Sequence, residues 1–387
     1  MLFSFGSNVY GDDGAYPTAA LIKVKGTLYG TTEYGGSYGG SDYVGYGTVF
    51  SVSTSGAENV LYSFSGGSDG AFPAGGLIYA NGNLCGTASA GGTYGDGTIF
   101  CVNITGKNFR VLHAFQGGST DGVDPMAGLV RIRDRLYGTT AEGGAYGDSN
   151  YSGGTVFRVD MVTSKERLIH SFGGSTDGAY PLAGLIDVKG TLYGTTEEGG
   201  DHNAGTVFAM STAGAETVLY RFNGSLPAAR HPVAGLIVMN GTLYGTTYGG
   251  GSADYGTVFA INTNGTNERV LHSFINDGSD GIRPYAGLTA VKGVLFGTTY
   301  NGGTACRGTK GSGIGCGTIF RVRTSGEERV LHSFGENYNN DGLYPAAALV
   351  NVDKTLYGTT VEGGIELPSC PHSGNICDYG TVFALTL

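Results

Sequence analysis

The sequence predicts an all-β fold, a seven-bladed β-propeller with four strands in each blade. Three observations predict it: a sequence unit that occurs seven times, a spacing of about fifty residues between copies, and four short β-type runs in each copy. A period of this length is typical of propellers and solenoids. Radial repetition of four-stranded sheets is the propeller arrangement, and it leaves only short sheet edges.

The repeated unit contains Leu-Tyr-Gly-Thr-Thr, a glycine pair, Gly-Thr-Val-Phe, Leu-His-Ser-Phe, and an Asp-Gly-x-x-Pro run that leads into Ala-Gly-Leu-Ile. Its opening leucines are Leu28, Leu84, Leu136, Leu192, Leu243, Leu295 and Leu356. Runs such as Leu185–Val188, Leu192–Thr196, Thr206–Ala209 and Val218–Phe222 are bounded by Gly, Asn, Asp and Pro, which predicts four strands. No stretch has a sustained 3.6-residue apolar period, so we expect little or no helix.

The two ends of the chain predict a closed ring. Gly380–Leu387 is only the third strand of its blade, whereas Met1–Phe5 is a copy of the fourth. We therefore expect the N-terminal strand to complete the last blade. An open solenoid would need atypical capping repeats at both ends, and none is visible. The uniform repeat predicts a single domain over residues 1–387.

Charge and composition narrow the classes of partner. The net charge is −10 and there is no Lys/Arg cluster, which argues against a nucleic-acid partner. There is no apolar run long enough to span a bilayer and no signal peptide, so we expect no membrane insertion. We expect the protein to be a monomer.

Six cysteines form three local pairs: Cys85/Cys101, Cys306/Cys316 and Cys370/Cys377. Local pairing outside the repeat consensus predicts three disulfides and an extracellular, periplasmic or cell-surface location. The alternative is that some cysteines are free or bind a metal, but no tight Cys-x-x-Cys spacing is present.

The two faces of the predicted ring differ in their loops. On one face the connections are minimal hairpin turns such as Lys25-Gly26, Asn81-Gly82 and Lys189-Gly190, which leave no room for a site. On the other face the loops range from 8 to 19 residues, and the long ones on blades six, seven and one are contiguous around the ring. Variable loops on a rigid scaffold are the usual place for function.

Comparing the copies separates shared structural residues from candidates. The recurring histidines His113, His170, His272 and His332 alternate with Phe3, Tyr62 and Tyr220, so we interpret them as packing residues. Six aspartates lie four residues before a proline and are expected to form Asx-type turns: Asp13, Asp69, Asp121, Asp177, Asp280 and Asp341. Structural calcium is the alternative for these aspartates, and no other cofactor is predicted.

The residue just before each of those prolines is variable. Around the ring it is Tyr16, Phe72, Asp124, Tyr180, His231, Arg283 and Tyr344. We expect these side chains to enter the innermost strands and to converge on the mouth of the central channel. His231, Arg283, Tyr180, Tyr344 and Asp124 are the catalytic candidates. The alternative is that these residues form a solvent-exposed rim in which the residue type varies without a functional role.

Further residues around the mouth are candidates for binding a substrate. Aromatic faces together with carboxylates suit sugar rings, whose C–H faces stack while their hydroxyls form hydrogen bonds. The alternatives are turn packing for the tyrosines and a solvated rim for the acids. These candidates are Tyr16, Phe72, Arg230, Glu33, Tyr34, Glu142, Glu197, Glu198, Tyr248, Tyr300 and Glu362.

The repeat resembles that of the GloVer (Gloeo-Verruco) tandem-repeat family, for example in Gly235-Leu236-Ile237, Leu243-Tyr244-Gly245-Thr246-Thr247 and Gly256-Thr257-Val258-Phe259. The resemblance covers almost the whole chain, and the glycine pair after the second strand is similar to Kelch blades. It implies a bacterial surface or secreted protein and transfers no catalytic motif.

Two functions follow as alternatives. The first is a polysaccharide-active enzyme. In a lyase, Arg283 would pair a uronate carboxylate while His231 or a tyrosine takes the C5 proton; a hydrolase would instead use two acids among Asp124, Glu142, Glu197 and Glu198. The lyase is preferred because the Tyr/His/Arg run occupies adjacent blades. The second function is a non-enzymatic glycan-binding or adhesion propeller.

Overall fold

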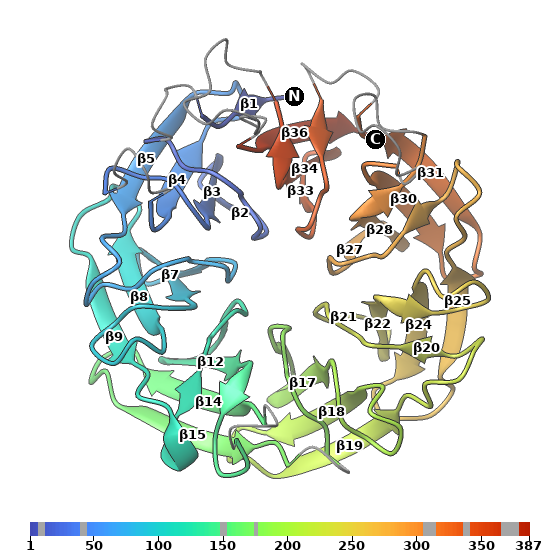
Figure 1. The fold of residues 1–387 in the computed structure, drawn as a ribbon, viewed down its shortest axis with the longest axis horizontal. Coiled ribbons are helices and arrows are strands. Elements are labelled where there is room, and N and C mark those ends of the chain that lie inside the picture. Colours follow the sequence, from blue (N-terminus) through green and yellow to red (C-terminus); the bar gives the residue numbers. More distant parts are fainter. Residues whose placement is uncertain are drawn as a thin grey trace, which may run out of the picture.

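The computed structural model describes residues 1–6, 12–38, 45–147, 153–173, 177–304, 315–335, 341–364 and 379–387. They form seven four-stranded antiparallel sheets arranged as blades around a central axis (Figure 1). The predicted seven-bladed propeller is confirmed. The helical structure in the described residues is a short 3-10 turn, η1 (Gly118–Thr120), and no helix there is long and apolar enough to cross a membrane.

Each blade runs from an inner three-residue strand to an outer strand. Blade one consists of β2 (Ile22–Val24), β3 (Thr27–Thr32), β4 (Thr48–Val52) and β5 (Glu58–Ser63), and blade two of β6 (Ile78–Ala80), β7 (Asn83–Ala88), β8 (Thr98–Asn103) and β9 (Arg110–Ala114). Blade three consists of β11 (Val130–Ile132), β12 (Arg135–Thr140), β14 (Thr155–Asp160) and β15 (Glu166–Ser171), and blade four of β16 (Ile186–Val188), β17 (Thr191–Thr196), β18 (Thr206–Ser211) and β19 (Glu216–Arg221). Blade five consists of β21 (Ile237–Met239), β22 (Thr242–Thr247), β24 (Thr257–Asn262) and β25 (Arg269–Ser273), and blade six of β27 (Thr289–Val291), β28 (Val294–Thr299), β30 (Thr318–Arg323) and β31 (Glu328–Ser333). Blade seven, the last, consists of β33 (Val350–Val352), β34 (Thr355–Thr360), β36 (Thr381–Thr386) and β1 (Phe3–Ser4).

The N-terminal strand closes the ring as predicted. β1 pairs antiparallel with β36, with Phe3 opposite Val382 and Ser4 opposite Thr381. The inner strands β2 and β33 also meet across the seam, and Figure 1 shows the two termini close together at the last blade.

Neighbouring blades are joined by pairs of phenylalanines. The last Phe of each outer-strand motif packs edge-to-face on the Phe of the Gly-Thr-Val-Phe strand in the next blade, for example Phe64 on Phe100 at 5.0 Å between ring centres. Such pairs contribute about 0.5–1.5 kcal/mol beyond burial. The remaining pairs are Phe5/Phe50, Phe115/Phe157, Phe172/Phe208, Phe222/Phe259, Phe274/Phe320 and Phe334/Phe383.

The glycine and threonines of Leu-Tyr-Gly-Thr-Thr have separate structural duties. A Cβ at Gly194 would lie 2.5 Å from Cζ of Phe208, so glycine makes room for the ring. The hydroxyl of Thr195 donates to the Ala234 carbonyl of the next blade at 3.2 Å. The hydroxyl of Thr196 donates to the Glu198 carbonyl at 2.9 Å and fixes the segment that follows the strand.

Short antiparallel ribbons hold the loops on the long-loop face. They pair the residue two positions before each conserved proline with the second residue after the Thr-Thr pair, as Val123 pairs with Glu142. Four ribbons are strands: β10 (Gly122–Val123) with β13 (Glu142–Gly143), β20 (Ala229–Arg230) with β23 (Gly249–Gly250), β26 (Gly281–Ile282) with β29 (Asn301–Gly302), and β32 (Gly342–Leu343) with β35 (Glu362–Gly363). Three are single bridges: Ala15/Tyr34, Ala71/Ala90 and Ala179/Glu198.

The opposite face carries the expected tight turns. Lys25 and Gly26 have φ angles of 50° and 89°, the left-handed pair that a type I′ hairpin requires. The expectation that this face has no room for a site is wrong, because a cavity of about 390 Å³ lies there between blades three and four, lined by Arg133, Asp134 and Asp160 among others.

The disulfide predicted between Cys85 and Cys101 is present. The two residues face each other on β7 and β8, with their Cα atoms 4.1 Å apart. Cys316 is also disulfide-bonded, while Cys306, Cys370 and Cys377 lie outside the described residues.

Candidate functional site

Seven residues around the channel share an unusual backbone conformation. The residue before each conserved proline has a φ between 55° and 59°, and it is never glycine: Tyr16, Phe72, Asp124, Tyr180, His231, Arg283 and Tyr344. A residue before proline normally adopts the extended region, and the left-handed region costs of order 1–3 kcal/mol. The sequence therefore places a strained residue at the same point of every blade.

Backbone hydrogen bonds hold this ring of residues. The N–H of Arg283 donates to the Tyr255 carbonyl of the preceding blade at 2.8 Å, and the Arg283 carbonyl accepts from the Tyr300 N–H of its own blade at 3.0 Å. The same two bonds recur at the other six positions. The pre-proline residues thus join adjacent blades. They lie in the loop six residues before the inner strand begins, which corrects the expectation that they enter the inner strands.

A cavity of about 480 Å³ lies at the channel mouth. All seven residues that follow the conserved prolines line it: Thr18, Ala74, Met126, Leu182, Val233, Tyr285 and Ala346. Four predicted site residues also line it, namely Glu33, Tyr248, Arg283 and Tyr300. The channel cavity is therefore apolar over most of its circumference and polar over blades five, six and one.

Tyr285 is a cavity residue that the sequence reasoning missed. It occupies the position after the proline, where the other blades have small or aliphatic residues. The pKa of Tyr285 is raised by burial and by the negative charges of Glu197 and Glu33 nearby, with Tyr248 contributing. Comparing the copies two residues further along, just after the proline, would have singled it out.

Tyr285 belongs to an arc of aromatic rings. Tyr248 and Tyr300 each lie 6.3 Å from Tyr285 between ring centres, and Tyr300 stacks on Tyr344 at 5.1 Å. A second group lies on blades one and two, where Tyr34 packs on Tyr16 at 5.6 Å and on Phe72 at 5.2 Å. All the predicted aromatic candidates except Tyr180 are thus gathered into two groups of neighbouring rings.

Arg283 is the cation of the cavity wall. Its guanidinium carbon lies 5.4 Å from the centre of the Tyr248 ring, a distance at which the ring face attracts the charge. The other predicted arginine, Arg230, is engaged differently: its Nε donates to Oδ1 of Asp254 at 3.0 Å, and its terminal nitrogen contacts the second oxygen. Of the two, Arg283 is the one that faces the cavity.

Carboxylates around the mouth raise one another's pKa. Burial, with the charges of Glu142 and Glu33, raises the pKa of Asp124 to about 6. Burial also raises the pKa of Glu33 and, together with the charge of Glu198, that of Glu197. The mouth therefore has several acids whose pKa values are raised, Asp124 among them.

Burial and nearby acids keep the tyrosines protonated. Burial first, then Glu362 and the neighbouring tyrosines Tyr344, Tyr285 and Tyr16, raise the pKa of Tyr300 to about 12. The pKa of Tyr344 is raised by burial and by Glu362, and that of Tyr180 by burial and the acids Asp124, Glu142 and Glu197. At neutral pH these phenols are hydrogen-bond donors.

His231 is oriented by a backbone contact. Its Nδ1 lies 3.2 Å from the Glu197 carbonyl oxygen. A carbonyl only accepts, so Nδ1–H is the donor, and in the neutral ring the lone pair is then on Nε2. Among Tyr180, His231, Arg283 and Tyr344, Arg283 lines the cavity and Tyr344 contacts it through Tyr300, whereas Tyr180 and His231 lie beside it near Glu197.

The recurring histidines and aspartates lie away from this mouth. His113 Nε2 is 3.0 Å from Asp121 Oδ2, and the N–H of Gln116 donates to the same oxygen at 3.0 Å. The pairs His170/Asp177, His272/Asp280 and His332/Asp341 repeat the contact. Within the described residues, the three-residue groups with metal-ligating side chains in mutual reach are found here and not at the mouth.

The sequence matches the Gloeobacter/Verrucomicrobia repeat family over residues 2–151 and 146–367. At the level of sequence, no curated protein matches the chain.

Several solved propellers are similar in fold. An oligogalacturonate lyase in complex with manganese superposes with a TM-score of 0.55 at 12% identity, covering 97% of this chain and 89% of that one. An oligogalacturonate lyase from Vibrio parahaemolyticus gives 0.53 at 11% identity, covering 90% and 86%. The extracellular domain of a proposed one-component system from B. thetaiotaomicron gives 0.59 at 11% identity, covering 94% of this chain and 39% of that one. At these identities the similarity is one of fold.

Proposed function

The chain belongs to the Gloeobacter/Verrucomicrobia repeat family, and from the geometry of its channel mouth we propose that it binds a uronate-containing glycan outside the cytoplasm and cleaves it by β-elimination. One observation carries the proposal: a single cavity brings Arg283 together with Tyr248, Tyr285 and Tyr300. Tyrosine faces stack on sugar rings, and a guanidinium pairs a carboxylate in two parallel hydrogen bonds. The buried disulfide supports an oxidising compartment.

In this reaction a base removes the proton on C5 of the uronate. The electron pair forms the C4–C5 double bond, the C4–O4 bond breaks, and the leaving oxygen takes up a proton. Arg283 stabilises the negative charge that moves onto the carboxylate during proton removal. His231, with its lone pair on Nε2, is the base, and a tyrosine whose pKa is raised, such as Tyr300, protonates the leaving oxygen.

The acids at the mouth limit which glycan fits. Glu33, Asp124, Glu142 and Glu197 repel a densely charged polyuronate, whereas their oxygens accept hydrogen bonds from neutral hydroxyls. We therefore expect a chain in which one uronate lies at Arg283 and neutral sugars lie on the side of Asp124. The proposed partner is an oligosaccharide or polysaccharide, bound by one copy of the chain.

Hydrolysis is the second candidate, and one observation favours it. Asp124, with its pKa raised to about 6, lies diagonally across ribbon β10/β13 from the exposed acid Glu142. An acid with a raised pKa beside a second carboxyl group is the pairing that glycoside hydrolysis uses.

The two reactions give different products, so one experiment separates them. The protein is incubated with a panel of acidic and neutral polysaccharides, and the ultraviolet absorbance of unsaturated uronate and the release of reducing ends are both followed. Elimination predicts both signals, with loss of both in Arg283→Ala and His231→Ala. The control is Arg269→Ala, an exposed arginine on outer strand β25, which should keep full activity.

Other outcomes are equally informative. Reducing ends without absorbance, lost in Asp124→Asn, would replace elimination by hydrolysis. Binding without turnover on any glycan would leave a binding or adhesion propeller. Neither binding nor turnover across the panel would remove the glycan proposal altogether.

A further inference from the structure

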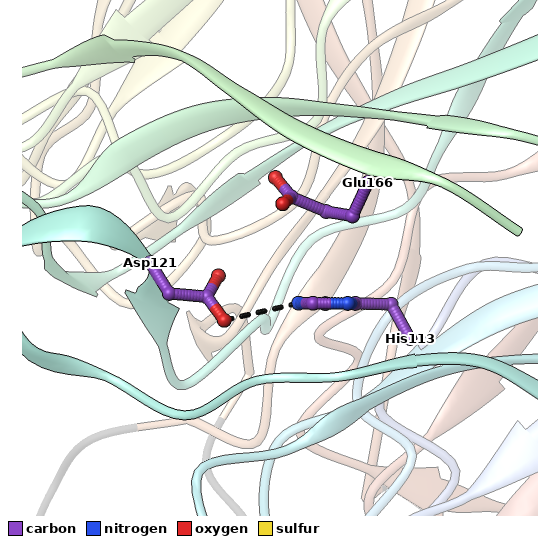
Figure 2. Close-up of side chains that lie close together, drawn as sticks. All are labelled: His113, Asp121 and Glu166. Atoms are coloured by element: carbon purple, nitrogen blue, oxygen red, sulfur yellow. Dashed lines mark hydrogen bonds and ion pairs between the residues drawn. The ribbon is translucent and has the colours of Figure 1, made fainter.

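The outer edge of the propeller carries a recurring three-residue cluster that the channel site does not use. A histidine on the outer strand of one blade meets an aspartate from the connection to the next blade and a glutamate that begins the next outer strand. The two tightest clusters are His113, Asp121 and Glu166, and His272, Asp280 and Glu328; within each, one ligand atom per residue lies within 4.8 Å of the others. Figure 2 shows the Glu166 carboxyl group pointing toward the Asp121 and His113 pair.

Two members of each cluster are held in place by the fold. Asp121 is 2% exposed. Its Oδ2 lies near His113, and its Oδ1 accepts a hydrogen bond from the Gly122 N–H at 2.8 Å. In the other cluster Asp280 accepts from the N–H groups of Ile275 at 3.1 Å and Gly281 at 2.7 Å. The imidazole rings pack edge-on against Phe115 and Phe274. The histidine and aspartate donor atoms are therefore held in place before any ion binds.

The glutamates supply an independent observation. Oε1 of Glu166 and Oε1 of Glu328 are buried and have no hydrogen-bond partner. A buried polar atom without a partner costs about 1–3 kcal/mol, a cost that a bound ion would remove. A bound cation at the centre of the cluster would satisfy both oxygens.

We propose that each of these two clusters binds a divalent transition metal ion such as Zn²⁺ through one imidazole nitrogen and two carboxylate oxygens. Zn²⁺ takes His and carboxylate ligands at about 2.0–2.2 Å, which puts neighbouring donors roughly 3.3–3.5 Å apart in a tetrahedron. His113 Nε2 and Asp121 Oδ2 are 3.0 Å apart, and His272 Nε2 and Asp280 Oδ2 are 3.2 Å apart. An imidazole ligand disfavours Ca²⁺, which prefers all-oxygen sites. A water completes the coordination.

At several other blade junctions one or two of the three ligand residues are replaced. Between blades one and two, Tyr62 replaces the histidine and Phe109 replaces the glutamate, and the two rings stack at 3.8 Å. Between blades four and five, Tyr220 and Ala228 replace the histidine and the aspartate. Between blades three and four all three residue types are present, but His170 Nε2 and Asp177 Oδ2 are 3.4 Å apart and the cluster is looser, so we expect weaker binding there.

The junction between the last and first blades provides a matched control. Glu58 begins its outer strand and has a buried Oε1 without a partner, as Glu166 does. Burial, and then the charge of the nearby Asp13, raise the pKa of Glu58. Phe3 occupies the histidine position, so this junction has the carboxylates without the nitrogen ligand.

The test is a calorimetric titration of the tag-free, chelator-treated chain with ZnCl₂. We expect two equivalents to bind tightly, with an increase in the midpoint of thermal unfolding, because the ion clamps two blades together. Glu166→Gln should bind one equivalent and the Glu166→Gln/Glu328→Gln double variant none, while Glu58→Gln still binds two. A weaker third equivalent would bind between blades three and four, where Glu216 begins the outer strand β19, and should disappear in Glu216→Gln.

A second readout needs no variant. Co²⁺ in place of Zn²⁺ gives an intense visible absorption in a four-coordinate site and a weak one in water, so the wild-type protein should develop the intense bands up to two equivalents. Absence of zinc binding in the wild type, or an unchanged stoichiometry in a folded double variant, would overturn the proposal. So would cobalt bands of the weak, hexa-aqua kind.

Discussion

The guanidinium carbon of Arg283 lies 5.4 Å above the centre of the Tyr248 ring, on the wall of the channel cavity. The two residues come from adjacent blades, so the position of the cation depends on how blades five and six pack. The ring limits where the long arginine side chain can lie, which reduces the entropy lost when it pairs a carboxylate.

Replacing Tyr248 by leucine should weaken binding of an acidic oligosaccharide. The contact between cation and ring is worth about 0.5–1 kcal/mol at an exposed site, which corresponds to about a two- to fivefold loss of affinity. Tyr248→Phe keeps the ring face and should bind as the wild type does. Calorimetry with one acidic oligosaccharide measures all three proteins, and equal losses in the Phe and Leu variants would assign the effect to the hydroxyl instead.

Affinity for an acidic ligand should rise as the pH falls through about 6. Asp124, with its pKa raised to about 6 by burial, Glu142 and Glu33, gains a proton in that range, and the repulsion at the mouth decreases. The ligand carboxylate stays ionised above about pH 5, so the change belongs to the protein. In Asp124→Asn the dependence of affinity on pH should flatten between pH 5 and 8, and an unchanged slope would exclude Asp124 as its cause.

Asp124→Asn should also change how the stability of the fold depends on pH. Because the folded pKa of Asp124 lies above the ordinary 3.8, its contribution to stability is fully present below that ordinary value and is lost as the pH rises through about 6. Asp124→Asn should therefore raise the unfolding midpoint at pH 8 and leave it nearly unchanged at pH 4. A midpoint lowered at pH 8 would contradict the raised pKa.

Much of the fold could be predicted because the same residues recur at the same packing positions in each copy of the repeat. The phenylalanine of the outer strand and that of the third strand recur, and they pack on each other at every blade junction. Met1–Phe5 could be assigned to the last blade because its sequence matches the outer strand of the repeat, and the last blade is the one whose own segment contains no outer strand. Repetition turns a weak local signal into a strong one.

The details of the mouth could not be predicted in this way. Residues before proline usually adopt the extended region, and no composition signal indicates that Tyr16 or Arg283 is left-handed. That conformation arises from backbone hydrogen bonds to neighbouring blade segments, which are long-range contacts. The comparison of pre-proline residues also overlooked Tyr285, which lies two positions after Arg283 and lines the cavity beside it.

Adding one methyl group at Gly194 should destabilise the fold. Its Cβ would lie 2.5 Å from Cζ of Phe208 and 2.8 Å from Cδ2 of Leu185, in a packed blade. Overpacking of this kind costs about 1–3 kcal/mol. Urea unfolding of Gly194→Ala measures the loss, with Gly235→Ala as the control because its Cβ would meet only the Gly184 carbonyl at an ordinary 3.5 Å. Equal stabilities of the two variants would mean that the ring of Phe208 can move aside.

Truncating Phe5 should open the ring at its seam. Phe5 is 2% exposed and lies 5.0 Å from Phe50 between ring centres, so removing its ring costs about 3–5 kcal/mol. Phe222→Ala removes the equivalent ring at a junction where the chain is continuous, and it should destabilise by a similar amount. Only Phe5→Ala should also speed hydrogen exchange at Val382, the residue of β36 that faces β1, because β1 is tied to β36 by few hydrogen bonds and leaves the sheet edge when Phe5 is lost. The same exchange rate at Val382 in both variants would show that β1 holds the seam without Phe5.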